Sequence, residues 1–173
     1  EYDIIVPELP ELPEDCSSQE RLDFMGDYLG IDEESLLSSV LQYYYGSKRV
    51  TSGLLRVFRK KLDDKVADYG IDIDKLKKQR LVEIVARTNG DFRRVREGLM
   101  VHHIQDVFSD LRRYHLRAEL KSLKANITQV IKDNYCRRTR SATALGTTRA
   151  SLAKFIEEEG INENKLKKKE IKR

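Results

Sequence analysis

A segment of this chain recurs at an interval of 45 residues, and this repeat constrains the fold more than any other feature. Residues 48–54 (KRVTSGL) align with residues 93–99 (RRVREGL), and a looser third copy follows at the same step. The ends of the copies keep the interval too, at residues 69–71 (YGI), 114–116 (YHL) and 159–161 (EGI). A fixed period of this length predicts one structural unit used three times.

The copies are separated by a short motif that predicts a joint between helices. It reads GIDEESL at residues 30–36, GIDIDKL at 70–76 and GINENKL at 160–166. We expect the glycine to end one helix in a left-handed conformation and the isoleucine to pack back. The following Asp or Asn is expected to cap the next helix. Ahead of the first joint, Ser17 or Ser18 predicts the start of a helix that continues to about Leu29.

Apolar residues within each copy have helical spacing, and no alternating strand pattern competes with it. The expected fold is all-α, built from tandem three-helix units of about 45 residues after an extended acidic lead. The predicted divisions are an extended lead at 1–16, a short helix or remnant unit at 17–30, unit 1 at 31–71, a degenerate unit 2 at 72–116, unit 3 at 117–162 and a basic C-terminal tail at 163–173.

Charge is distributed unevenly along the chain. Residues 1–40 contain twelve acidic residues and one basic residue, a net charge of −11, which leaves +15 for the remainder. This asymmetry predicts a body that binds a polyanion and an acidic terminal segment. Pro7, Pro10 and Pro13 favour an extended lead that docks on a partner protein or folds back on the body. A second hypothesis is that residues 1–40 imitate DNA and mask the basic body.

The third copy has the clearest local pattern, within residues 141–152 (SATALGTTRASL). Ala142 permits two helices to cross closely, and Gly146 permits a positive φ at a turn. Thr147 or Thr148 is placed to cap the helix that follows. A supporting helix, a tight turn and a second helix with outward-facing N-terminal residues make a helix-turn-helix. The stretch resembles the helix-turn-helix of the Fis family and of the C-terminal domains of NtrC-type activators, over about residues 120–162.

The resemblance implies a double-stranded DNA partner and a set of DNA-facing positions. In the third copy these are Thr148, Arg149, Ser151 and Lys154. The matching positions are Phe58, Arg59, Lys61 and Asp64 in the first copy, and His103, Ile104, Asp106 and Ser109 in the second. The first copy has Leu55-Arg56 where the third has Leu-Gly, so the geometry of its turn stays open. The second copy lacks phosphate ligands at these positions, which indicates a spacer or packing unit.

Further basic residues flank the predicted turns and extend the candidate DNA-binding set. They are Arg56, Arg59, Lys60 and Lys61 in the first copy, Arg93 and Arg94 in the second, and Arg137, Arg138 and Arg140 in the third. No phosphate loop, nucleophile elbow, HExxH or paired-carboxylate motif occurs, and the adjacent His102 and His103 point in different directions on a helix. We therefore expect a non-catalytic protein without a cofactor or metal, and no membrane span.

The leading hypothesis is a DNA-binding protein that acts in transcription regulation or as a phage DNA-packaging adaptor. It predicts a nucleoid-associated location in the cytoplasm of a bacterial or phage-infected cell. One alternative is a DNA-targeting domain of a larger recombinase or nuclease. Another is a helical-repeat scaffold for protein partners. The DNA hypothesis requires Arg59, Arg137, Arg149 and Lys154 on one continuous face; the oligomeric state stays open.

Overall fold

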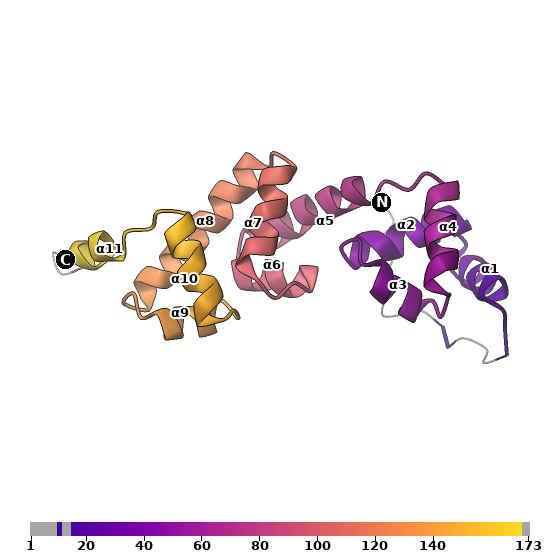
Figure 1. The fold of residues 1–173 in the computed structure, drawn as a ribbon, viewed down its shortest axis with the longest axis horizontal. Helices are drawn as coiled ribbons and strands as arrows, with labels where there is room; N and C mark the ends of the chain where they lie inside the picture. Colours follow the sequence, from indigo (N-terminus) through magenta and orange to yellow (C-terminus); the bar gives the residue numbers. More distant parts are fainter. Residues whose placement is uncertain (1–9, 12–14, 171–173) are drawn as a thin grey trace. The chain divides into compact units, whose positions relative to one another are not determined.

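The protein is all-α in the computed structural model, which describes residues 10–11 and 15–170, with side chains up to Leu166. Eleven helices and no strand occur in this part of the chain (Figure 1). The predicted extended lead and the end of the basic tail lie mostly outside the described residues. The helices are α1 (Ser18–Leu29), α2 (Glu33–Tyr43), α3 (Lys48–Leu54), α4 (Arg59–Asp68), α5 (Ile73–Arg87), α6 (Phe92–Leu99), α7 (Ile104–Arg113), α8 (Arg117–Asp133), α9 (Arg138–Ala144), α10 (Arg149–Glu158) and α11 (Glu163–Glu170).

The helices follow one another as a longer, a short and a medium helix, three times over. We call α2–α4 the first triplet, α5–α7 the second and α8–α10 the third. The last helices of the triplets begin at Arg59, Ile104 and Arg149, so each start lies 45 residues beyond the previous one. After the third triplet, α11 begins where a further longer helix would stand, in the segment predicted as a tail.

The joints between helices have the predicted conformation. The glycines at 30, 70 and 160 all have positive φ angles, of 66°, 63° and 61°. The residue two positions later accepts a hydrogen bond from a backbone N–H at the start of the next helix, through Asp32, Asp72 and Asn162. The predicted start of α1 is confirmed as well, because the Ser17 side chain and Glu20 form a reciprocal capping box.

The chain divides into two compact structural units, which are distinct from the three-helix triplets. The first unit is residues 1–80, and the second unit is residues 81–173. The first unit surrounds a core of aliphatic side chains from α1, α2, the α3–α4 turn and α4. Three consecutive tyrosines lie at the end of α2: Tyr45 is buried, and Tyr43 and Tyr44 meet edge to face with ring centroids 5.1 Å apart. The core residues are Leu22, Met25, Leu36, Leu37, Val40, Leu41, Leu55, Val57, Leu62 and Val66.

The second unit contains the end of α5 and all of α6–α11, and its core brings α7, α8, α9 and α10 together. Phe108 of α7 and Phe155 of α10 are both buried and meet edge to face at 4.7 Å. The C-terminal end of α10 is tied to two other helices by Glu159, which forms ion pairs with Lys124 of α8, at 2.9 Å, and with Arg112 of α7. The medium helices of the second and third triplets therefore pack directly on one another.

Candidate functional site

The turn between α9 and α10 has the conformation expected for the third copy. Gly146 has a φ of 66°, and Ala142 and Leu145 are buried beneath the turn. A Cβ atom at Gly146 would lie 2.8 Å from the Arg96 guanidinium, so a side chain here would require the end of Arg96 to shift, and glycine adopts the positive φ without strain. Thr148 caps α10 by accepting a hydrogen bond from the Ser151 N–H at 3.1 Å. The turn thus fixes the direction in which α10 begins.

The turn between α3 and α4 reproduces this backbone without glycine. Arg56 adopts a φ of 49°, in the left-handed region that Gly146 occupies in the third triplet. The following residue closes the turn in both cases: Val57 N–H donates to the Ser52 carbonyl at 3.0 Å, and Thr147 N–H donates to the Ala142 carbonyl at 2.9 Å. The α3–α4 turn, whose geometry the sequence left open, therefore has the same backbone conformation as the α9–α10 turn.

The second triplet differs at the same point. Its left-handed residue is Met100, with a φ of 57°, one position earlier than in the other two triplets. Ile104, which matches Arg149, is 0% exposed, so the resemblance is wrong in placing this position on an outer face. Its neighbour His103 precedes α7 without a capping hydrogen bond. The middle triplet thus presents an apolar core residue where the third presents an arginine.

Four predicted arginines line one shallow hollow in the second unit. Arg137, Arg138 and Arg140 come from the start of α9, and Arg149 begins α10, around a volume of about 640 Å³. All four side chains are exposed. Within the described part of the chain, Arg138 is the only one of the four in an ion pair. The turn therefore brings Arg149 beside the three arginines at the start of α9, and three of the four are available to an external anion.

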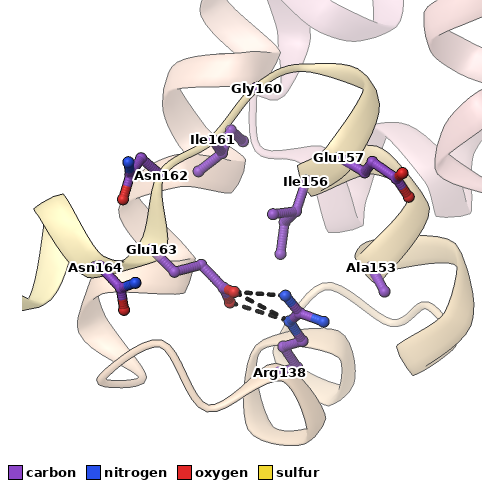
Figure 2. A pocket seen from close by; sticks show the side chains of 9 residues that line it. All are labelled: Arg138, Ala153, Ile156, Glu157, Gly160, Ile161, Asn162, Glu163 and Asn164. Carbon is purple, nitrogen blue, oxygen red and sulfur yellow. Dashed lines mark hydrogen bonds and ion pairs between the residues drawn. The ribbon is translucent and has the colours of Figure 1, made fainter.

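The fourth arginine is held by the start of α11. Figure 2 shows Glu163 extending toward Arg138, and its carboxylate accepts hydrogen bonds at 2.6 Å from Nη2 and 3.1 Å from Nε. These hydrogen bonds raise the pKa of Arg138 above its ordinary value. The pair closes one side of a second hollow, of about 570 Å³, between α10 and the α10–α11 joint. Sequence reasoning missed this contact because no local pattern links two residues 25 positions apart.

Ser151 is buried rather than on the outer face that the resemblance implies. Its side chain is 7% exposed and lies between α7 and α10. The Ser151 hydroxyl accepts a hydrogen bond from the Ile104 N–H at 3.2 Å and donates to Gln105 Oε1 at 2.8 Å. The Gln105 amide donates in turn to the Ser151 carbonyl at 2.9 Å. Ser151 therefore positions α10 on α7, and its hydroxyl is already engaged by Ile104 and Gln105.

Lys154 is exposed on α10 but does not join the arginine hollow. It lies five residues beyond Arg149, roughly 140° further round the helix axis. Its ammonium group lies 3.7 Å from Glu158 on the same helix. On α6, Arg93 is similarly paired with Glu97 at 3.0 Å, whereas Arg94 is exposed without an ion pair in the described part of the chain. Of the remaining predicted cations in this unit, Arg94 is thus the most available.

The first unit has its own basic group at the α3–α4 turn. Arg56, Arg59 and Lys60 are exposed, and Lys61 is half-buried. None of these four forms an ion pair with a described residue. Asp63, on the same helix, is occupied by Lys48 at 2.6 Å, and this hydrogen bond lowers the pKa of Asp63. The beginning of α4 is consequently cationic over its first turn.

Among the described residues, no group of three or more His, Cys, Asp or Glu side chains is arranged to hold a metal ion. No helix in the same part of the chain combines the length and apolar character needed to cross a bilayer. Comparison with protein-family models, curated proteins and solved structures finds no match to this chain. The two basic turns, α3–α4 and α9–α10, are therefore the candidate functional sites.

Proposed function

We propose that this protein binds double-stranded DNA through helix-turn-helix elements formed by α3–α4 and α9–α10, in the manner of the Fis-type proteins that the third copy resembles. The observation that carries the proposal is the hollow lined by Arg137, Arg138, Arg140 and Arg149. Guanidinium groups clustered at the N-terminus of a helix bind phosphate through charge and paired hydrogen bonds. The helix that follows such a turn is the element that enters the major groove in known helix-turn-helix proteins.

The first and third triplets supply the contacts in this proposal, and the second supplies packing. Arg59 and Arg149 occupy the same position, at the first residue of α4 and of α10. Affinity arises mainly from neutralised phosphates, so it falls steeply as salt concentration rises. A transcription regulator, a phage DNA-packaging adaptor and a targeting domain of a larger enzyme would all use such a module. A nucleoid-associated location would follow from binding to any duplex.

The test is fluorescence anisotropy with a labelled 30-base-pair duplex over a range of salt concentrations. Arg149→Ala and Arg59→Ala are each expected to weaken binding by roughly 5- to 150-fold, the equivalent of about 1–3 kcal/mol for a specific arginine contact. Each loss of a phosphate contact also lowers the salt slope by about 1. Lys121→Ala is the matched control, since Lys121 is exposed on α8 away from the hollow. Equal affinity of the parent and both arginine variants at moderate salt would overturn the proposal.

A protein-binding helical scaffold is the second candidate, and one observation favours it. Adjacent medium helices stack directly in the second unit, with Ser151 and Gln105 sealed between α7 and α10. Stacked helices of successive repeats are the architecture of solenoids that bind proteins along an extended face. The same titration separates the candidates, because a scaffold shows no duplex binding that depends on Arg59 or Arg149.

A further inference from the structure

Phe58 is the most exposed large apolar side chain in the described part of the protein. It is 81% exposed, whereas Leu55 and Val57, in the same turn, are buried in the core of the first unit. Phenylalanine side chains are ordinarily withdrawn from water because burial of the ring is favourable. The turn therefore places Leu55 and Val57 inside and directs the larger Phe58 side chain outward.

The fold of the first triplet does not use this side chain. Phe58 is the N-cap residue of α4, and no side-chain hydrogen bond caps that helix. Thr148 occupies the matching position of α10 and caps it by accepting from Ser151 N–H. Serine, threonine, aspartate and asparagine are the residues that satisfy an N-cap. The first triplet thus has an outward aromatic ring where a capping hydroxyl would serve the helix better.

The surroundings of the ring indicate what it contacts. Arg56, Arg59 and Lys60 are exposed on either side of it, and none is in an ion pair with a described residue. Two carboxylates follow on α4. Asp63 is bound to Lys48, and Asp64 lies at the next turn of the helix. A ligand for this edge needs anionic groups for the cations and an apolar surface for the ring. DNA provides both, as phosphates and as the bases with their thymine methyl groups.

We propose that Phe58 makes the base contact of the first triplet, packing its ring on a thymine methyl group in the major groove of double-stranded DNA. Arg56, Arg59 and Lys60 hold the flanking phosphates. This inference rests on the proposed DNA binding and adds a preference for thymine. It also explains why the N-cap of α4 is not a capping residue.

The experiment combines a protein substitution with the removal of the methyl group from DNA. Phe58→Thr installs the residue that the third triplet has at this position, and one duplex carries thymine while a second carries uracil throughout. The parent protein is expected to bind the uracil duplex about fourfold more weakly, which corresponds to ~0.8 kcal/mol for one buried methyl group. Phe58→Thr is expected to bind the two duplexes equally, and both more weakly than the parent binds thymine DNA.

Two further readouts separate base contact from charge and from folding. Phe58→Thr should leave the salt slope unchanged, whereas Arg59→Ala lowers it by about 1. The melting temperature of Phe58→Thr should equal or exceed that of the parent, because threonine restores a cap. Tyr28→Thr is the matched control: Tyr28 is 60% exposed on α1, beside Asp27 rather than among cations, and its loss should change neither affinity nor thymine preference.

The outcomes distinguish this inference from the function on which it rests. If Arg59→Ala weakens binding and Phe58→Thr binds as the parent does, the thymine contact is wrong and the DNA-binding proposal stands. A loss in Phe58→Thr that leaves the thymine preference intact also overturns the contact. If none of the Phe58, Arg59 and Arg149 substitutions changes duplex binding, both proposals fall together.

Discussion

The α3–α4 turn and the α9–α10 turn share a backbone conformation and an arginine at the first residue of the following helix, but differ at the left-handed residue and at the N-cap. In both, the chain reverses between a short and a medium helix through a left-handed residue and a backbone hydrogen bond between residues five positions apart. The first turn achieves this with Arg56 and exposes Phe58, whereas the third uses Gly146 and caps its helix with Thr148. The comparison teaches that the repeat preserves the position of a helix start while the chemistry offered there varies.

The same contrast extends to what holds each medium helix in place. In the first unit, Glu33 at the start of α2 is bound by Lys65 at 2.7 Å and by Tyr69 at 3.1 Å, both from the end of the α4 region. In the second unit, Glu159 at the end of α10 receives Lys124 and Arg112. One glutamate joins helices in each unit, but Glu33 lies at the start of a triplet and Glu159 at the end of one.

The largest expected effect tests whether the two medium helices are equally integrated into their cores. Leu62 of α4 and Leu152 of α10 occupy the same position of the repeat, and both are 0% exposed. Leu62→Ala and Leu152→Ala should each lower the free energy of unfolding by about 2–5 kcal/mol, through lost burial and a residual cavity. Urea unfolding followed by circular dichroism measures both. A cost below about 1 kcal/mol for one of them would show that its helix is not anchored by this leucine.

An intermediate effect, of opposite sign in the two turns, tests the left-handed residue. Gly146→Ala should destabilise the protein by about 1–2 kcal/mol, since its new methyl group meets Arg96 and its φ stays positive. Arg56→Gly should stabilise it by about 0.5 kcal/mol, because relief at φ 49° exceeds the entropy lost by glycine on folding. Thermal unfolding of both variants checks the signs. Equal signs would show that the two turns do not share a conformation in solution.

The smallest effect concerns acid sensitivity in the first unit. Partial burial acts to raise the pKa of Glu33, but hydrogen bonds from Lys65, Gln19 and Tyr69 outweigh it, so the folded-state pKa is lowered. The unfolded state then binds the proton more readily, and this stabilisation is present above the ordinary pKa of 4.5 and lost as pH falls through the folded value. Glu33→Gln should flatten the pH dependence of urea unfolding on the acidic side. Glu34→Gln, at the exposed neighbouring residue, is the control and should leave the dependence steep.

Local sequence was sufficient to predict the joints and the capped starts of α1, α2 and α10. The capping residues Ser17, Asp32 and Thr148 each bond to a backbone N–H three positions later, so the determining atoms belong to one short segment. The helical periodicity, the positive φ of Gly146 and the all-α fold follow from equally local rules. The turn at Arg56 was less predictable, because a non-glycine residue adopts the left-handed region when the surrounding core determines the backbone.

The sequence by itself determined the helical periodicity, the capped joints between helices and the positions of the basic residues along the chain. Only the tertiary structure decided which of those residues face outward. Ser151 is sealed against α7, and Arg138 is held by Glu163, while Arg137, Arg140 and Arg149 gather around one hollow. These outcomes depend on contacts between residues up to 47 positions apart. Such contacts form only when helices pack, so a pattern read over one helical turn does not contain them.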